Sequence, residues 1–376
     1  MKIPFHQYHL LKLLEGYDDQ HLPLDLFINH YFRAHKALGS KDRGFIAETV
    51  YSLVRWRDLL DHLCEKPISW EKRLQVLSTT NLAEIQKRDD IPLHIRLSHP
   101  KILFDLIVQS HGQEKACQIC LANNLPAPTT VRCNPLKTTR DDLLERWQNL
   151  YSVSPCQWAP NGITFHKKIN FFSLAEYKEG LFEVQDEGSQ LLANLVDAQP
   201  GQLILDYCAG SGGKTLAFAP KMGNTGQIYL HDIRAYILQE SRQRLRRAGI
   251  QNAQVIQAED VKLKKLKKKM AWVLVDVPCS GSGTIRRNPD MKWKFSEEAL
   301  VKLVGQQRSI FEKALSFMHP EGRIVYGTCS LLKEENQDQV EHFLKIYPLE
   351  LVGPYFQSLP TEGGMDGFFG AVLKYR

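Results

Sequence analysis

The sequence predicts an α/β protein whose largest part is a doubly wound, Rossmann-like parallel sheet over residues 181–376. From about residue 183 onward, short apolar strand-like runs alternate with helical stretches. The hydrophobic fraction of 43% and the charged fraction of 24% are typical of a globular protein. A chain of 376 residues is long enough for two or three domains, so further domains are expected before the sheet.

Residues 1–90 are predicted to be helical, and residues 91–180 to form a smaller α+β region. Apolar residues recur at spacings of three and four in LDLFINHYFRAHKAL and DRGFIAETVYSLVRWRDLLDHL, with few glycines or prolines inside. Further on, prolines flank the strand-like run TTVRC. The sequence therefore predicts two smaller regions ahead of the sheet.

The predicted sheet is built from short buried strands separated by helices. The strand-like runs are LILDY, QIYLHD, AQVIQ, WVLVDV and GRIVYG, and the clearest helices are AYILQESRQRLRRAG and SEEALVKLVGQQRSIFEKALSFM. In sheets of this kind, ligands bind at the carboxyl ends of the strands. The residues directly after each strand are therefore the candidates for a functional site.

A glycine-rich turn, CAGSGGKT, comes after the first of these strands. Glycines permit a tight turn and close approach of a ligand, and the helix behind the turn offers free N–H groups. A P-loop would need glycine where Cys208 stands, and a dinucleotide-binding turn would need glycine where Thr215 stands. S-adenosylmethionine needs a glycine turn for its methionine carboxylate and ribose, but no phosphate cradle. The turn alone leaves these three ligands open.

Acidic residues come after the second and third strands. Asp232 ends QIYLHD, where a carboxylate can accept both hydroxyls of a ribose. Asp260 comes after the third strand, where an acid could reach an adenine amino group. Either residue could instead cap a helix. Their succession after the glycine turn favours an adenosyl ligand.

Two cysteines come after the fourth and fifth strands. Cys279 lies in DVPCS, after Asp276, and Cys329 lies in TCS. A single cysteine at a strand end is commonly a buried apolar filler. A pair of cysteines at the ligand-binding edge, one of them beside an Asp-x-Pro, favours a chemical role.

A pyrimidine methylase has a specific need for such a thiol. Carbon 5 of cytosine is not nucleophilic enough to take a methyl group from a sulfonium. A thiolate that adds to carbon 6 converts the ring to an enamine, which makes carbon 5 reactive. A carboxyl group at ring nitrogen 3 stabilises the adduct, and Asp276 is placed for that role.

The chain from Phe182 to its end resembles the Sun/Fmu family of RNA cytosine-5 methyltransferases. The matching segments are VQDEGSQL, LDYCAGSGGKT, DVPCSGSGTIRRNPDMKW, YGTCSLLKEENQDQV and DGFFGAVLK. Upstream, PTTVRCNPLKTTRDDLLE resembles the small RNA-recognition-like subdomain of this family, and LGSKDRGFIAETVYSLVRW resembles part of its NusB-like helical domain. The resemblance implies a partial NusB-like domain over residues 1–90, an RNA-recognition-like subdomain over 91–180 and a methyltransferase domain over 181–376.

The resemblance also implies the roles of individual residues. Cys329 is the nucleophile, Cys279 is needed for product release, and Asp276 contacts the base; Lys214 belongs with these catalytic residues. The implied S-adenosylmethionine site consists of Cys208, Ala209, Gly210, Ser211, Gly212, Gly213, Lys214, Asp232, Asp260 and Asp276. Where the family usually has Ala-Pro-Gly-Gly-Lys, this chain has Ser211 in place of the proline, which is expected to loosen the turn.

RNA is the implied partner, with small-subunit ribosomal RNA favoured and transfer RNA left open. Basic residues cluster at Lys262, Lys264, Lys265, Lys267, Lys268, Lys269, Arg242, Arg244, Arg246 and Arg247. The cluster is either a solvated surface or a phosphate-binding face. A second basic group, Arg286, Arg287, Lys292 and Lys294 around Trp293, is either a set of phosphate contacts or a loop with a buried tryptophan.

Other functions are less consistent with the sequence. No apolar run approaches the ~18 residues of a membrane span, and the start does not resemble a secretory signal. We therefore expect a cytoplasmic monomer with eight free thiols. Cys117-x-x-Cys120 has no second cysteine pair and the histidines form no ligand cluster, so no metal is expected. The alternatives, a P-loop-like NTPase or a non-catalytic RNA-binding assembly factor, leave the two thiols without a role.

Overall fold

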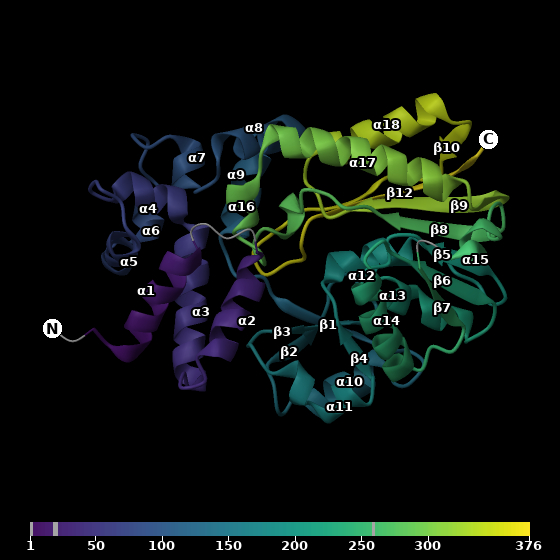
Figure 1. Cartoon of the computed structure of the whole chain (residues 1–376), viewed down its shortest axis with the longest axis horizontal. Helices are drawn as coiled ribbons and strands as arrows, with labels where there is room; N and C mark the ends of the chain where they lie inside the picture. The colour runs from purple at the N-terminus through teal and green to yellow at the C-terminus, as the bar shows by residue number, and fades with distance from the viewer. Residues whose placement is uncertain (1–2, 18–21, 258–259) are drawn as a thin grey trace. The chain divides into compact units, whose positions relative to one another are not determined.

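The computed structural model describes residues 3–17, 22–257 and 260–376, and the chain divides into two compact units (Figure 1). Unit 1 comprises Met1–Pro126 together with Thr284–Glu297. Unit 2 comprises Ala127–Gly283 together with Glu298–Arg376. In the described ranges, no helix is both long enough and apolar enough to cross a membrane.

The described residues of unit 1 form helices joined by turns and loops, with no strand among them. Its helices are α1 (Phe5–Tyr17), α2 (Leu24–Ala34), α3 (Ser40–Arg55), α4 (Arg57–Leu63), α5 (Trp70–Thr79), α6 (Leu82–Ile85), α7 (Leu93–Arg96), α8 (Lys101–His111), α9 (Gln113–Asn123) and α16 (Met291–Lys294). Leucines spaced three and four residues apart on α1 pack against α3 in one apolar core. The predicted helical region thus continues past residue 90, because α8 and α9 belong to the same unit.

The segment Thr284–Glu297 joins unit 1 through buried polar groups. Lys292 is fully buried and donates hydrogen bonds to the carbonyls of Arg55 (2.8 Å) and Ser98 (2.7 Å). Burial without a paired carboxylate lowers the pKa of Lys292 to about 7. Arg286 is also buried, at 1% exposure. The interpretation of Arg286 and Lys292 as phosphate contacts is therefore wrong, because neither side chain reaches the surface.

Unit 2 begins with a small antiparallel sheet. Its strands, in the order β2-β3-β1-β4, are β2 (Val153–Pro155), β3 (Gly162–Phe165), β1 (Thr129–Cys133) and β4 (Phe182–Val184). The predicted strand TTVRC is β1. Helix α10 (Arg140–Trp147) begins at a capping box between Thr139 and Asp142, and Trp147 packs on Phe165 and Phe182.

The large sheet of unit 2 has the order β10-β12-β9-β8-β5-β6-β7. The parallel strands are β5 (Leu203–Asp206), β6 (Gln227–His231), β7 (Ala253–Ile256), β8 (Met270–Asp276) and β9 (Met318–Thr328). Strand β12 (Phe368–Tyr375) runs antiparallel to β9, and β10 (Leu349–Leu351) and β11 (Phe356–Ser358) pair with β12. The predicted doubly wound sheet is confirmed, and the antiparallel edge extends it.

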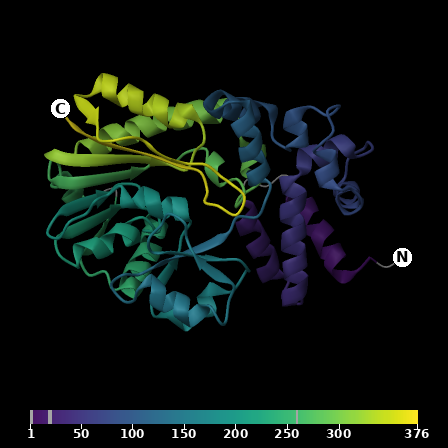
Figure 2. The ribbon, with the colours of Figure 1, turned by 180° about the vertical axis from the view of Figure 1, so that it is seen from behind.

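Helices cover both faces of the large sheet (Figures 1 and 2). Helices α12 (Glu187–Asn194), α13 (Thr215–Phe218) and α14 (Ala235–Ala248) lie on one side, and α17 (Glu297–Leu315) and α18 (Gln337–Ile346) on the other. Each face of the sheet packs in its own apolar core. Successive side chains of β5 point to opposite faces, so Ile204 packs in one core and Leu205 in the other. Strand order reverses between β5 and β8, which opens a ligand site at their carboxyl ends.

Candidate functional site

The glycine turn runs from the end of β5 to α13. Gly210 and Gly212 have φ of 52° and 81°, a left-handed conformation that side chains with a Cβ disfavour. A Cβ built on Gly213 would meet nothing within 4 Å, so the backbone there borders open space. Asp206 precedes the turn, and its buried Oδ1 has no hydrogen-bond partner. The turn therefore offers a ligand both exposed backbone and an unsatisfied acid.

Asp232 lies beside this turn, directly after β6. Its Oδ2 accepts the N–H of Gly210 (2.9 Å), and both carboxylate oxygens accept hydrogen bonds from Arg234. Burial raises the pKa of Asp232, but the hydrogen bonds from Arg234 and Gly210 outweigh it, so the pKa lies below its usual value. The Arg234 side chain is 51% exposed. The hydroxyls of a ribose could therefore replace the Arg234 guanidinium as donors to the Asp232 carboxylate, and no buried side chain would have to move.

The third acid, Asp260, has a local partner. Its Oδ1 accepts the N–H of Lys262 (2.9 Å) and so caps the short helix α15 (Val261–Lys264). The helix-cap interpretation of Asp260 is confirmed, and its contact with adenine stays a prediction. Ile233 and Val261, which the sequence alone did not single out, are 76% and 67% exposed after the neighbouring strands β6 and β7. Exposed apolar side chains at these positions suit the faces of an adenine ring.

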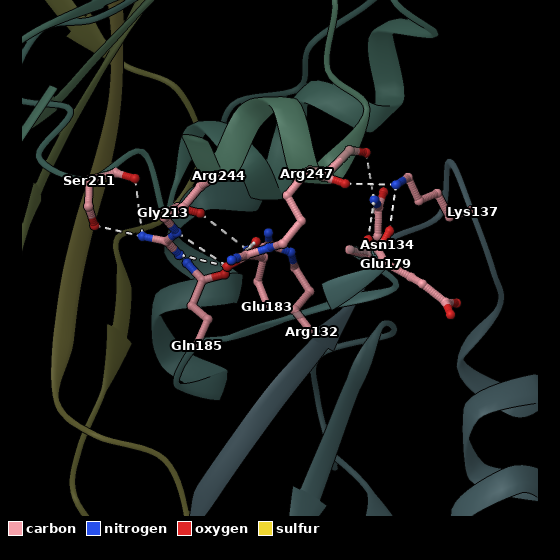
Figure 3. Close-up of polar contacts among 12 residues, drawn as sticks. Arg132, Asn134, Lys137, Glu179, Glu183, Gln185, Ser211, Gly213, Arg244 and Arg247 are labelled. Atoms are coloured by element: carbon pink, nitrogen blue, oxygen red, sulfur yellow. Dashed lines mark hydrogen bonds and ion pairs between the residues drawn. The ribbon is translucent and has the colours of Figure 1, made fainter. Parts of the chain in front are cut away.

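Two arginines donate hydrogen bonds to backbone carbonyls of the glycine turn (Figure 3). Arg244 of α14 donates to the carbonyl (3.1 Å) and the Oγ (2.6 Å) of Ser211. Arg132 of β1 is buried and donates to the carbonyl of Gly213 (3.2 Å). Ser211 thus gives the turn an anchor that a proline side chain could not provide. Hydrogen bonds therefore fix the turn at Ser211, contrary to the expectation that this residue loosens it.

Glu183 of β4 anchors this arrangement (Figure 3). Its carboxylate, 5% exposed, accepts hydrogen bonds from Arg244 (3.0 Å) and Arg247. The Arg244 and Arg247 side chains are only 16% and 19% exposed. The interpretation of these two arginines as part of a phosphate-binding face is therefore wrong, because both side chains are turned inward to a buried carboxylate. Arg242 and Arg246 remain exposed on the same helix.

Removing the Arg244 side chain is expected to weaken S-adenosylmethionine binding. Arg244→Ala leaves the Ser211 carbonyl and part of the Glu183 charge unpaired, at a cost of about 1–3 kcal/mol. The dissociation constant measured by titration calorimetry should rise about five- to hundredfold. Arg242→Ala, on the exposed face of α14, is the matched control and should leave the affinity unchanged. Equal affinities for the two variants would remove Arg244 from the cofactor site.

The two predicted thiols meet at the carboxyl ends of β8 and β9. The Sγ atoms of Cys279 and Cys329 lie 3.4 Å apart. The hydrogen bond to Cys329, together with burial, raises the pKa of the Cys279 thiol well above its usual value. Cys279 therefore keeps its proton and can donate it to the sulfur of Cys329.

An ion pair lies beside the thiols. Lys214, at the end of the glycine turn, binds the carboxylate of Asp276. Burial lowers the pKa of Lys214, but the charge and hydrogen bond of Asp276 outweigh it, and Cys329 adds to the increase. The net pKa is raised, so Lys214 stays cationic. The structure thus brings together the four predicted catalytic residues.

Glu335 links the two thiol-bearing loops, a position that the sequence alone did not reveal. It is fully buried and accepts hydrogen bonds from Ser280 N (2.8 Å), Ser280 Oγ (2.5 Å), Ser330 Oγ (2.5 Å) and Gln307 Nε2 (2.9 Å). Ser280 and Ser330 each come directly after one of the two cysteines. One carboxylate therefore fixes both thiol-bearing loops. In the sequence, Glu334-Glu335 has the pattern of an exposed charged turn, which gives no sign of this role.

The described residues contain no group of three or more histidine, cysteine or acidic side chains that could hold a metal ion. The glycine turn, Asp232 and the open backbone at Gly213 fit an adenosyl cofactor. The thiol pair lies at the carboxyl ends of the neighbouring strands, where a nucleophile for a bound base is expected.

Comparison with known families gives two matches along the chain. Residues 193–374 match the model described as 16S rRNA methyltransferase RsmB/F. Residues 99–171 match the ferredoxin-like domain of the RsmF/B-like methyltransferases. This second match begins within the helices of unit 1 and extends through most of the small sheet.

Similar sequences and structures agree with these matches. The probable ribosomal RNA small subunit methyltransferase B of Synechocystis is 31% identical over 77% of this chain and 70% of its own length. The ribosomal RNA small subunit methyltransferase B of Vibrio cholerae is 35% identical over 74% of this chain and 66% of its own length. The matched part thus spans about two thirds of these relatives.

Solved structures show the same fold. A methyltransferase homolog from Pyrococcus horikoshii has a TM-score of 0.67 and 28% identity over 75% of this chain and 97% of that one. The structure of PH0851 has a TM-score of 0.83 and covers 100% of this chain and 99% of its own, with 21% identity.

Proposed function

Because this chain belongs to the RsmB/F family of 16S rRNA methyltransferases, we propose that it methylates carbon 5 of a cytosine in small-subunit ribosomal RNA. The family depends on S-adenosylmethionine. The observation that carries the proposal is the pair of thiols 3.4 Å apart beside the Lys214–Asp276 ion pair. The reaction at carbon 5 needs a nucleophile for carbon 6, and Cys329 supplies it.

The first step joins the enzyme to the base. The Cys329 thiolate adds to carbon 6 of cytosine, a carbon–sulfur bond forms, and the electron pair of the 5,6 double bond moves toward carbon 5. Nitrogen 3 takes a proton from the Lys214–Asp276 pair through the Asp276 carboxyl group, which neutralises the charge of the adduct, and returns it when the adduct breaks down. Lys214 holds the Asp276 carboxylate in place. When bound, S-adenosylmethionine supplies the methyl group that carbon 5 accepts.

The last step releases the product. Cys279 donates its proton to the departing sulfur of Cys329 as the carbon–sulfur bond breaks. The electron pair that expels this sulfur comes from the carbon 5–hydrogen bond, whose proton passes to Cys279 as the 5,6 double bond re-forms and restores the aromatic ring. One proton passes to solvent when the Cys329 thiolate re-forms. The raised pKa of Cys279 supports this assignment, since the residue must hold a proton before the step begins.

The division of the chain is part of the proposal. The helices of unit 1 act as the partial NusB-like domain, the small sheet of unit 2 as the RNA-recognition-like subdomain and the large sheet of unit 2 as the catalytic domain, so that the first boundary lies at Pro126 and not at residue 90. The enzyme works as a monomer in the cytoplasm, where its ribosomal RNA substrate is made in bacteria such as those of its relatives.

Bisulfite sequencing of total RNA tests the proposal. In cells that contain the gene, one cytosine of the small-subunit ribosomal RNA should resist deamination, and it should lose this protection when the gene is deleted. Complementation with the wild-type gene should restore protection, and complementation with Cys329→Ala should not. If deletion changes the protection of no cytosine in any RNA, the proposed reaction is wrong.

The lysine-rich segment is expected to contribute sequence-independent RNA affinity. Lys262, Lys264, Lys265, Lys267, Lys268 and Lys269 are all exposed. Leu263 and Leu266 between them pack against the core and turn the lysines outward. The logarithm of the RNA association constant falls linearly with the logarithm of the salt concentration. Replacing four of the lysines by glutamine should make this slope less steep by as much as about 3, because fewer counterions are released. Filter binding at several salt concentrations measures this slope.

The control for this prediction carries Lys302→Gln and Lys313→Gln, two exposed positions on α17. If the slope of the four-lysine variant equals that of this control, the segment is only a solvated surface.

A further inference from the structure

We infer that a pocket beside Trp158 binds a nucleobase that neighbours the target cytosine in the same RNA strand. The inference rests on the proposed RNA substrate. The pocket has a volume of about 470 Å³ and lies wholly within unit 2. Its walls come from the loop between β2 and β3, from α12, and from β11 with the loop after it.

Trp158 is exposed although the backbone that carries it is fixed. The residue is 62% exposed, which is unusual for the largest apolar side chain. The buried carboxylate of Glu187 accepts the N–H groups of Trp158 (2.5 Å) and Ala159 (2.9 Å). A Cβ on Gly162 would come within 2.6 Å of the Cys156 sulfur, so the loop also packs closely on β3. The fold therefore holds this indole outward at a defined place.

A series of contacts links the wall of the pocket to the thiol site. Next to Glu187 is Gly188, where a Cβ would come within 2.7 Å of the Phe368 ring. The Nζ of Lys214 also lies over that ring, 5.9 Å from its centroid. The preceding residue, Gly367, donates its N–H to Gly283, whose own N–H binds the carbonyl of Cys329. The loop that carries Cys329 and the helix that carries Glu187 are thus joined through the segment Gly367–Phe368. A base in the pocket and a base at Cys329 would therefore contact neighbouring segments of unit 2.

The lining favours a base over a phosphate or a protein. No lysine or arginine is among the residues that line the pocket in the described chain, and the Glu187 carboxylate disfavours an anion. Phe356 and Leu191 offer apolar surface, and the exposed amides of Gln157 and Gln357 offer donors and acceptors for a base edge. Stacking on an exposed aromatic ring is the usual way that proteins hold an unpaired base. The eleven described residues that line the pocket are also fewer than the roughly 20–30 that each side of a stable protein–protein interface contributes.

Steady-state methylation of a 16S rRNA transcript tests the inference. Trp158→Ala should raise the KM for the transcript about tenfold, the usual effect of losing one stacked base, and leave the KM for S-adenosylmethionine unchanged. Trp158→Phe keeps an aromatic face and should stay within about threefold of wild type. The matched control is Phe172→Ala, which removes another exposed aromatic ring (67%) outside the pocket. Circular dichroism confirms that each variant folds.

A second measurement does not depend on any substitution. A transcript that carries 4-thiouridine, irradiated on the wild-type protein, should cross-link to the peptide that contains Trp158. Absence of this cross-link, or a KM for Trp158→Ala equal to that for Phe172→Ala, overturns the inference. A change in sedimentation of Trp158→Ala with an unchanged KM would instead identify the pocket as a protein interface. If the wild-type protein transfers no methyl group to any RNA, the proposed function itself fails, which is a distinct result.

Discussion

Cys279→Ala is expected to accumulate a covalent protein–RNA adduct, whereas Cys329→Ala should give neither adduct nor methylated RNA. Without Cys329, no sulfur attacks carbon 6, so the reaction stops before any bond forms. Without Cys279, attack and methyl transfer proceed, but proton donation to the leaving sulfur and removal of the carbon 5 proton both fail. Turnover should fall by at least about a thousandfold in both variants.

Denaturing gel electrophoresis with labelled RNA separates these outcomes. The Cys279→Ala adduct should remain at the mass of protein plus RNA after heating in detergent. The control is Cys117→Ala, which removes a cysteine that belongs to unit 1. If Cys329→Ala traps the adduct and Cys279→Ala loses all activity without one, the roles are reversed. If neither variant loses methylation, the thiol mechanism is wrong.

Glu335→Ala is expected to destabilise the protein and to separate the two thiols. The substitution leaves the donors on Ser280, Ser330 and Gln307 without their shared acceptor. Loss of a buried, charge-assisted acceptor of this kind should lower the free energy of unfolding by about 3 kcal/mol or more. Urea titration followed by circular dichroism measures this change.

The milder variant Glu335→Gln tests positioning apart from stability. It keeps the shape of the side chain but exchanges one acceptor oxygen for an NH₂ group. Either the two serine hydroxyls or the N–H groups of Ser280 and Gln307 then lose their acceptor. We expect kcat to fall more than about tenfold with an unchanged KM for RNA. Oxidation by diamide should also join Cys279 to Cys329 more slowly than in wild type. Glu334→Gln, at the neighbouring and partly exposed position, is the control. Equal kcat values and oxidation rates for the two variants would deny Glu335 a positioning role.

The sequence was informative where function depends on the residues directly after a strand. The runs LILDY, QIYLHD and WVLVDV are strands of the parallel sheet, and Asp232 lies beside the glycine turn as its position after β6 predicts. The proximity of Cys279 and Cys329 has the same cause, because β8 and β9 are adjacent parallel strands.

The sequence was uninformative where a role depends on a distant partner. Glu183 and Arg244 are far apart along the chain, so nothing local distinguishes their buried ion pair from exposed charges. Glu335 belongs to a charged run, and its burial results from the packing of α17 and β9 around it. Lys292 was misinterpreted for the same reason, because its acceptors are carbonyls and an amide of other helices.

Release of tritium from RNA that carries [5-³H]cytidine tests the central claim most directly. Methylation at carbon 5 expels the hydrogen that carbon 5 held, whereas methylation at a ring nitrogen, at the exocyclic amine or at the ribose leaves it in place. The purified protein, incubated with S-adenosylmethionine and a 16S rRNA transcript labelled in this way, should release one tritium into water for each methyl group transferred. Cys329→Ala should release none. Methyl transfer without tritium release would contradict the account.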